Sequence, residues 1–130
     1  MERRIINPWA WQDQFGFVQA NEVSGERRTI YCAGQTSNDD GRTVHPGDMR
    51  AQFNKAMDNL ETILREADAE LSDVVRLTYY TTDVDRFFGE YDAVVGRLEE
   101  AGCQPATTLL GVSRLASPEV LVEIEATAVV

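Results

Sequence analysis

Two glutamates lie two positions apart near the carboxyl end of the chain. Glu123 and Glu125 belong to the β-rich run Leu121–Val130, which predicts a strand that carries both carboxylates on one face. A second β-rich run, Pro105–Val112, precedes this strand across a short, turn-like connection. A carboxylate on a central strand must face water, a partner or a binding site, and a carboxylate beside water can act as a general base.

Other residue types that support catalysis are scarce. His45 is the only histidine and lies in a turn-rich loop before a predicted helix, which favours a solvent-facing or capping role. The two cysteines, Cys32 and Cys103, are too few for a disulfide framework and lack the spacing of a zinc site. Cys32 is expected in the core of a strand, whereas Cys103 follows Gly102 in a loop, a position compatible with exposure. We expect reduced thiols, no metal and no cofactor.

The composition limits the possible classes of protein. A length of 130 residues is typical of one domain, here residues 1–130. The 22 acidic and 12 basic residues give a formal charge of -10, which opposes binding to nucleic-acid phosphates. Every apolar run is shorter than the roughly 20 residues that a bilayer requires, and Met1–Arg4 does not lead into a signal-peptide core. We therefore expect a cytoplasmic protein with no membrane and no nucleic-acid partner.

The amino-terminal half predicts an irregular segment followed by two strands. Ile5–Trp11 is rich in aromatic residues and is expected to be irregular, and Phe15–Val23 is expected to be the first strand. Ser24–Glu26 has the composition of a turn, and Arg28–Gln35 has the β-branched and aromatic content of a second strand, so the two strands are expected to form a hairpin. Gly34 is expected to mark a β-bulge or a close backbone approach.

A helix and a third strand follow. The polar loop Thr36–Pro46 has strong turn chemistry. From Met49 to Ala67 apolar residues recur at steps of three and four, which predicts the clearest helix of the chain, with Asp48 as its N-cap. The run Val74–Thr81 predicts the third strand.

A second helix completes the list of elements. Its apolar positions run from Val84 to Leu98, Thr82 and Asp85 have the spacing of a capping box, and Gly102 suits the end of the helix. The resulting order, β-β-α-β-α-β-β, predicts an α+β fold in which a mixed sheet carries both helices on one face.

The other face of this sheet needs a cover. The strands are apolar at nearly every position, and no residues remain in the chain to cover the second face. The simplest cover is another copy of the chain, so we expect a homo-oligomer whose sheet faces pack together.

Short motifs in a consistent order resemble the RidA family, also called YjgF or L-PSP. The similarity extends from about residue 15 to the end of the chain, and the order of the motifs is more specific than any one of them. The motifs are Val18-Gln19-Ala20, Cys32-Ala33-Gly34-Gln35-Thr36, His45-Pro46-Gly47-Asp48-Met49, Asp58-Asn59-Leu60, Asp73-Val74-Val75-Arg76-Leu77, Thr81-Thr82-Asp83-Val84, Pro105-Ala106-Thr107-Thr108 and Val122-Glu123-Ile124-Glu125-Ala126.

The resemblance implies a chorismate-mutase-like fold and a homotrimer with small-molecule clefts between adjacent subunits. Active members of the family hydrolyse enamines or imines to ketones and ammonia. In these members an arginine after a Pro-Ala dipeptide holds the substrate carboxylate, and a strand glutamate positions the attacking water. The matching positions in this chain are Thr107 and Glu123.

Thr107 is the main departure from the family pattern. A guanidinium holds a carboxylate through two charge-assisted hydrogen bonds, which a hydroxyl cannot reproduce. At about 1.5–3 kcal/mol for each bond, the loss of one or two bonds weakens carboxylate binding by about one to four orders of magnitude. We therefore expect a ligand without an obligatory carboxylate, hydrogen-bonded by Thr107 and Thr108, with Glu123 as general base toward water at an imine or enamine carbon.

The resemblance assigns further residues to the cleft. Phe17 stands where the family often has tyrosine, Ala33 and Gly34 where it often has Ser-Gly, and Tyr91 where it often has asparagine. Leu109 is expected to offer its backbone amide to the ligand. Because hydroxyl groups are missing at two of these positions, the cleft is expected to be less polar than is usual in the family.

Several alternatives stay open at the level of sequence. Glu123 also fits an interface carboxylate paired with an arginine of a neighbouring subunit, and the whole protein also fits a non-catalytic trimer that binds or senses a small metabolite. Arg76 or Arg114, from some subunit, is a candidate replacement for the missing guanidinium. Trp9 and Trp11 fit either hydrophobic anchors or a lid over the cleft. A ribonuclease activity is disfavoured by the net charge and the single histidine.

Overall fold

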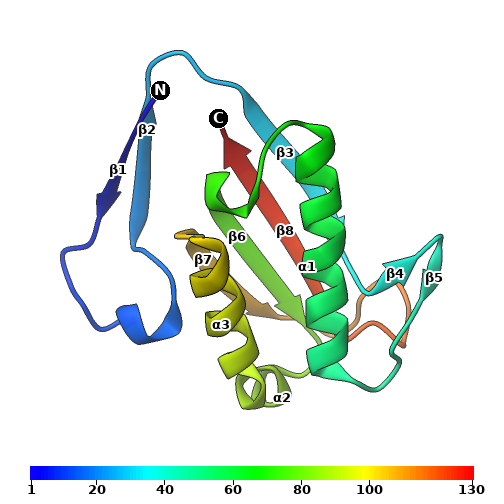
Figure 1. The fold of residues 1–130 in the computed structure, drawn as a ribbon. Helices are drawn as coiled ribbons and strands as arrows, with labels where there is room; N and C mark the ends of the chain where they lie inside the picture. The colour runs from blue at the N-terminus through cyan, green and yellow to red at the C-terminus, as the bar shows by residue number, and fades with distance from the viewer.

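A mixed sheet of four strands in the order β3-β8-β6-β7 forms the centre of the computed structural model, which describes all 130 residues (Figure 1). Strand β8 (Val122–Val129) pairs antiparallel with β3 (Thr29–Gln35) and with β6 (Val74–Thr81). Strand β6 pairs in parallel with β7 (Ala106–Gly111). The α+β fold and these four predicted strands are confirmed, and the parallel pair is joined by a helical crossover, as parallel pairs require.

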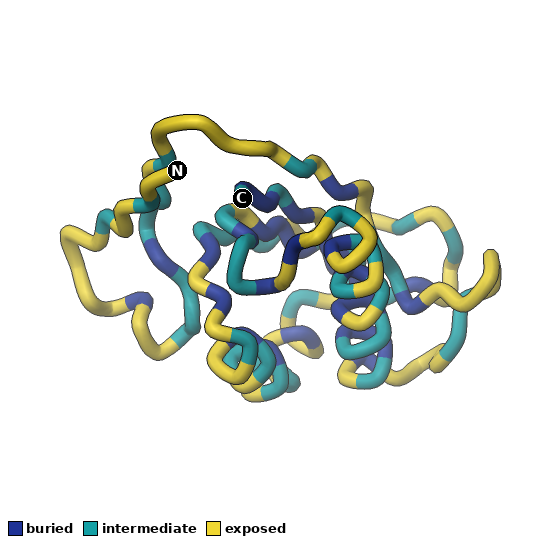
Figure 2. The backbone as a smooth tube through the Cα atoms, turned by 45° about the horizontal axis from the view of Figure 1, so that its top comes forward, coloured by how far each residue is buried: buried dark blue, intermediate teal, exposed yellow.

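The helices lie on one face of the sheet (Figure 1). They are α1 (Met49–Glu66), α2 (Val84–Gly89) and α3 (Tyr91–Ala101), and two short 3-10 helices, η1 (Asp13–Phe15) and η2 (Leu71–Asp73), lie in the connections. Figure 2 shows that buried positions gather on the strands and helices, whereas the connecting loops are largely exposed. The other face of the sheet, here called the open face, has no element of this chain over it.

Helix α1 begins and packs as its periodicity predicts. The Asp48 side chain accepts a hydrogen bond from the Ala51 amide at 3.0 Å and so caps the first turn. The inward side of α1 packs against alternate residues of β8, and all of these side chains are at most 2% exposed: Met49, Phe53, Ala56, Met57, Leu60, Leu64, Val122, Ile124, Ala126 and Ala128.

The open face is not apolar at nearly every position, and this part of the sequence interpretation is wrong. Side chains alternate along a strand, and β8 presents Glu123, Glu125 and Thr127 between its buried residues. Tyr31 from β3 is 81% exposed on this sheet. A polar and aromatic surface therefore lies opposite the helices.

The predicted amino-terminal hairpin is also wrong. Strand β2 (Ala20–Ser24) pairs with a strand that was not predicted, β1 (Glu2–Ile6), whose last two residues belong to the segment expected to be irregular. Strand β3 pairs with β8 and not with β2. The strand expected from Phe15 begins later, because Phe15 ends η1 and Gly16 adopts a left-handed φ of 77°.

Polar side chains hold the β1–β2 ribbon against the main sheet. The Arg3 guanidinium donates hydrogen bonds of 2.8 Å to the carbonyls of Ser72 and Gln104. The Asn21 amide donates to the carbonyls of Val75 and Gln104 at 2.9 and 3.0 Å. These bonds satisfy backbone groups beside β6 and β7, and they explain why the ribbon docks at this edge.

The second predicted helix is two helices in the structure. Helix α2 ends at Gly89 and α3 begins at Tyr91, and Glu90, with a φ of -111°, is the C-cap of the first helix and the N-cap of the second. The N-cap is Asp83, whose carboxylate accepts from the Arg86 amide at 3.1 Å, and not the expected capping box of Thr82 and Asp85. The helix ends at Gly102 as predicted, with a left-handed φ of 65°.

The polar loop before α1 contains a small hairpin of β4 (Asn38–Asp39) and β5 (Arg42–Thr43), turned at Asp40 and Gly41, both with positive φ. This agrees with the turn chemistry of that loop.

Gln52 connects helix α1 to the segment that leads into β8. Its side chain is fully buried, and its amide donates to the carbonyls of His45 and Glu119 at 3.1 and 2.9 Å. Its carbonyl accepts from the Leu121 amide at 2.9 Å. A glutamine within a helix therefore fixes the loop that positions the start of the glutamate-bearing strand.

We expect Gln52→Met to destabilise the protein by about 2–5 kcal/mol, because the Glu119 carbonyl and the Leu121 amide lose their hydrogen-bond partner inside the protein. The measurement is equilibrium denaturation in urea or guanidinium chloride. Thr62→Val, on the exposed side of the same helix, is the control and is expected to change stability by less than about 0.5 kcal/mol. Equal, small effects for both variants would contradict the role assigned to Gln52.

Candidate functional site

A small apolar cavity of about 270 Å³ lies on the helix side of β7, next to the amino-terminal segment. Four of its lining residues, Phe17, Tyr91, Thr107 and Leu109, are cleft residues expected from the sequence. We call this cavity the aromatic pocket. Its lining consists of Trp11, Phe15, Phe17, Tyr79, Phe87, Phe88, Tyr91, Thr107 and Leu109.

Strand register determines which residues of β7 reach the aromatic pocket. Thr107 is the register partner of the buried Leu77, and Leu109 is the partner of the buried Tyr79. Partners in register share a face of the sheet, so Thr107 and Leu109 face the helices. Thr108, between them, faces the open side.

A hydrogen bond holds the amino-terminal segment over the pocket. The Tyr91 hydroxyl donates to the Phe15 carbonyl at 3.1 Å, so the ring of Tyr91 lines the pocket while its hydroxyl is already engaged. The Trp11 ring packs edge-on against Phe17, with 5.9 Å between the ring centroids. Trp11 thus lies at the pocket, whereas Trp9 is 61% exposed and is not part of the lining.

Tyr79 is a pocket residue that the sequence interpretation did not single out. It is 1% exposed, and its hydroxyl is the one buried side-chain nitrogen or oxygen atom without a hydrogen-bond partner. Burial raises the pKa of this hydroxyl well above its ordinary value of 10, so it stays a neutral donor. The sequence does place a tyrosine at an inward-facing position of this strand. A buried tyrosine usually has a hydrogen-bond partner for its hydroxyl, so this position could have been singled out.

Glu123 and Gly34 lie together on the open face. The pairing of β3 with β8 shifts register between Cys32 and Gln35, so Ala33 and Gly34 form a bulge there. A Cβ atom at Gly34 would lie only 2.8 Å from Cδ of Glu123. The predicted β-bulge at Gly34 is confirmed, and what approaches this glycine closely is the Glu123 side chain and not another backbone segment.

The two glutamates of β8 have different surroundings. Glu125 is exposed and accepts a hydrogen bond from the Tyr80 hydroxyl at 3.1 Å, and this bond raises the pKa of Tyr80. Glu123 is half-buried, and its carboxylate forms neither a hydrogen bond nor an ion pair. Of the two carboxylates, Glu123 is the one with free acceptor capacity.

Neither candidate arginine lies in the aromatic pocket of its own chain. Arg76 donates to Thr108 Oγ1 at 2.7 Å on the open face. Arg114 donates to the Leu115 carbonyl at 3.3 Å in the loop before β8. Within one chain, therefore, no guanidinium stands beside Thr107, and the hydroxyl of Thr108 is bonded to Arg76.

The expected site residues form two groups on opposite faces of one sheet. Phe17, Tyr91, Thr107 and Leu109 line the aromatic pocket, whereas Glu123 lies on the open face with Ala33, Gly34 and Thr108. Glu123 is the register partner of Tyr80, and Tyr79 beside it is the partner of Ile124. The sheet itself thus separates Glu123 from the pocket of the same chain.

Comparisons with known proteins identify the family. Residues 14–130 match the family described as Endoribonuclease L-PSP. The chain belongs to the RidA (YjgF, L-PSP) family. A RutC family protein of Pyrococcus abyssi is 35% identical over 100 residues, which are 76% of this chain and 76% of the relative. YyfB of Yersinia pestis, a crystal structure described as a protein of unknown function of the conserved Rid family, matches with a TM-score of 0.87 and 39% identity over 100% of both chains.

Another relative bears on localisation. The mitochondrial protein mmf2 of Schizosaccharomyces pombe is 30% identical over 96 residues, 74% of this chain and 75% of that protein. A cytoplasmic location for this RidA-family protein therefore stays a prediction. None of the helices is both long and apolar enough to span a membrane.

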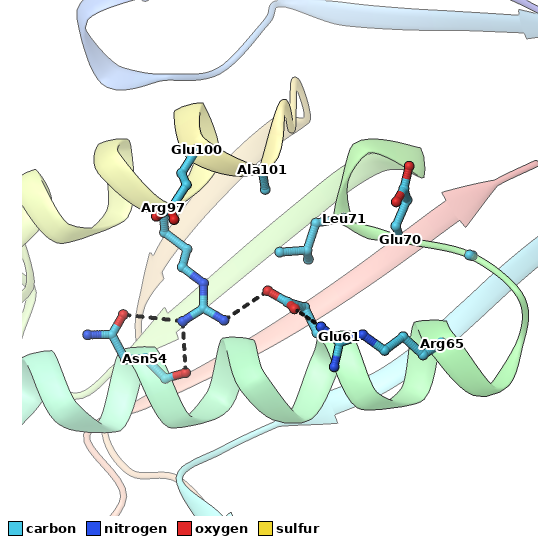
Figure 3. Close-up of a pocket in the computed structure, with 9 residues that line it drawn as sticks. Asn54, Glu61, Arg65, Glu70, Leu71, Arg97, Glu100 and Ala101 are labelled. Carbon is cyan, nitrogen blue, oxygen red and sulfur yellow. Dashed lines mark hydrogen bonds and ion pairs between the residues drawn. The ribbon is translucent and has the colours of Figure 1, made fainter.

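A larger groove of about 710 Å³ lies between α1 and α3 of this RidA-family protein, away from the expected site residues (Figure 3). Figure 3 shows Arg97 reaching from α3 toward Asn54 and Glu61 of α1. Its guanidinium forms ion pairs with Asp58 at 2.6 Å and Glu61 at 3.0 Å. Because the Arg97 guanidinium is already paired with these two carboxylates, we interpret the groove as a helix–helix junction and not as the ligand site.

Both cysteines are buried. Cys32 is 6% exposed, as expected for a core residue. Cys103 is 4% exposed, which corrects the expectation that its loop position could leave it accessible. Burial raises the pKa of Cys103 to about 12, so its thiol is protonated and unreactive near neutral pH.

Proposed function

We propose that this protein is a homotrimer that binds a small uncharged molecule in clefts between its subunits and hydrolyses an imine or enamine group of that molecule to a carbonyl compound plus ammonia. Glu123 is the general base of this proposal. The observation that carries it is the half-buried Glu123 carboxylate, which has no protein partner and for which Gly34 leaves room.

The chemistry needs one carboxylate and one water molecule. Glu123 accepts a proton from water as the water oxygen forms a bond to the C=N carbon. Glu123 passes this proton to the nitrogen, and the added hydroxyl group gives its proton to the nitrogen as the C–N bond breaks, the C=O bond forms and ammonia leaves. An enamine first gains a proton at carbon and loses one from nitrogen, which converts it to the imine. One water is consumed for each ammonia released, and Glu123 ends in its starting state.

A trimer would unite the two groups of site residues. Glu123 and the aromatic pocket lie on opposite faces of one chain's sheet, so a site that uses both needs two chains. Packing of the open face against another copy would cover Tyr31, which is 81% exposed, and Leu110, which is 44% exposed. Covering a large exposed aromatic residue is favourable.

The substrate class follows from the pocket. No charged side chain lines it, and Thr107 stands where the family resemblance expects the carboxylate-binding arginine. A carboxylate buried there would lose its hydration without gaining an ion pair, which is strongly unfavourable. We therefore propose that 2-imino acids are poor substrates.

Two other functions have some support in the family description and in the pocket. The family description contains the word endoribonuclease, but a formal charge of -10 opposes close contact with RNA phosphates. A non-catalytic protein that binds or senses a metabolite is the second candidate, favoured by the largely apolar pocket. Such a protein has no turnover, so Glu123 has no catalytic role in it.

We expect Glu123→Gln to lower the rate of ammonia release from uncarboxylated imines by at least about 100-fold, because general-base catalysis contributes about 100- to 10,000-fold. Glu125→Gln is the matched control, because it changes a carboxylate on the same face that is already bonded to Tyr80, and it is expected to keep most of the activity. If the wild type accelerates no imine across carboxylated and uncarboxylated panels but still binds metabolites, the non-catalytic function replaces this one.

We expect Thr107→Arg to raise activity on 2-imino acids at least about tenfold, because a guanidinium supplies the missing charge-assisted hydrogen bonds. Thr107→Lys, which adds the charge without the planar fork, is expected to give a smaller gain. Both are measured as kcat/KM for ammonia release from 2-imino acids. The absence of any gain with arginine would mean that the pocket has lost carboxylate specificity at more positions than Thr107.

A further inference from the structure

We propose that residues 7–19, here called the lid segment, form a movable lid over the aromatic pocket, and that the hydrogen bond from the Tyr91 hydroxyl to the Phe15 carbonyl is its latch. Tyr91 is then a positioning residue, which acts on a ligand through the segment that it holds. The lid is independent of the proposed function, whereas the claim that it admits the substrate rests on that function.

The lid segment is built like an Ω loop, a compact surface loop whose ends lie close together and whose own side chains fill it. Its ends are joined where the Gln19 amide donates to Asn7 Oδ1 at 2.8 Å. Every residue from Pro8 to Gln14 except Gln12 is exposed. The Gln12 side chain is fully buried and bonds within the segment, to Asp13 at 3.3 Å and to Gln19 at 3.0 Å. Such internal bonds allow the loop to move as one body.

The lid segment has few bonds to the rest of the protein between its two ends. Residues 8–17 form one hydrogen bond with a residue outside the segment, the 3.1 Å bond between the Phe15 carbonyl and the Tyr91 hydroxyl. Packing adds to this bond, because the rings of Phe15 and Tyr91 lie 6.1 Å apart and Gly16 lies against helix α3. A surface segment held by so few bonds opens at a low free-energy cost.

The lid segment supplies part of the pocket wall. Trp11, Phe15 and Phe17 are three of the nine lining residues, and the other six come from β6, β7, α2 and α3. Trp11 and Phe17 pack edge-on with 5.9 Å between their centroids, so their rings would leave the pocket together. Of the two alternatives that the sequence left open for Trp11, an anchor or a lid, the geometry favours the lid.

Tyr91 is suited to be the latch because its two ends have different partners. Its ring is held by the body of the protein: Phe88 stacks on it with 5.8 Å between the centroids, and Phe87 meets it at 5.8 Å and an angle of 57°. Its hydroxyl reaches the backbone of the lid segment. Burial raises the pKa of this hydroxyl, so it is a donor at neutral pH. While the lid is closed, the hydroxyl is therefore not free to bind a ligand.

The other walls of the pocket are poorly placed to move. Tyr79 and Phe87 are core residues, each 1% exposed, and a close-packed core resists displacement. In the trimer of the proposed function, the open face of a neighbouring subunit would meet this pocket. The lid segment is then the wall that can move without separating subunits or disrupting the core, as loops over binding sites do.

A latched lid has a kinetic signature that a fixed wall lacks. If a ligand enters and leaves only while the lid is open, loss of the latch raises the association and dissociation rates by the same factor and leaves Kd nearly unchanged. The net contribution of one hydrogen bond makes this factor about two- to tenfold. Loss of a contact in a fixed wall would instead raise the dissociation rate alone and weaken binding.

The test uses fluorobenzene as the probe and Tyr91→Phe as the variant. A dry cavity of roughly 150 Å³ holds benzene, and the aromatic pocket measures about 270 Å³, so the probe fits. Fluorobenzene has no strong hydrogen-bond acceptor, so the lost hydroxyl cannot act through a direct bond to it. Fluorine-19 NMR exchange measurements give Kd and both rates. We expect both rates to rise about two- to tenfold in Tyr91→Phe and Kd to change by less than about twofold.

Tyr80→Phe is the matched control, because its hydroxyl donates to Glu125 on the open face and not to the lid segment. We expect this variant to change neither rate. Unchanged rates in Tyr91→Phe, or a faster dissociation rate with a proportionally weaker Kd, would overturn the lid. Failure of the wild type to bind fluorobenzene would overturn it as well, because the segment would then cover no ligand pocket.

The two proposals fail in different ways. If Tyr91→Phe raises both rates but no imine is hydrolysed, the proposed function is wrong and the lid stands. If imines are hydrolysed with Glu123 dependence but Tyr91→Phe leaves the fluorobenzene rates unaltered, the function stands and the lid is wrong.

Discussion

The alternation of side chains along β8 is the constraint on which the structure depends. Val122, Ile124, Ala126 and Ala128 enter the core under the helices and are nearly inaccessible. Because successive side chains point to opposite faces, the same strand must present Glu123 to the open face. A shift of one residue in register would bury the carboxylate and expose the core. The same register of β8 therefore determines both the packing of the helices and the position of the proposed base. Gln52 stabilises this register by forming hydrogen bonds to the segment just before β8.

The same alternation on β6 gives two adjacent tyrosines different roles. Tyr79 points inward and lines the aromatic pocket, and its hydroxyl is buried without a partner, whereas Tyr80 points outward and bonds to Glu125. On β7 the alternation turns Thr107 toward the pocket and Thr108 toward Arg76. Each strand thus contributes to both faces, which is why the expected site residues separate into two groups in a single chain.

Much of this organisation could be predicted from sequence because it depends on local periodicity. The period of α1, its cap at Asp48, the strand Val74–Thr81 and the glycine at position 34 all act through near neighbours in the chain. The pairing of β2 could not, because it depends on distant hydrogen bonds from Arg3 and Asn21 to backbone carbonyls. The burial of the Tyr79 hydroxyl without a partner was likewise not predicted, because it depends on residues that are distant in the chain. The faces of Thr107 and Thr108 required the register of the parallel pair.

We propose a site that is completed by two subunits, one supplying Glu123 and the other the aromatic pocket. The most direct measurement is the activity of mixed trimers of two inactive variants, Glu123→Gln and Thr107→Trp, the second of which fills the pocket. After joint refolding, with mixed trimers verified by native mass spectrometry, random assembly of equal amounts is expected to restore about a quarter of the wild-type sites. Mixed trimers that remain as inactive as either variant alone would contradict a site shared between subunits.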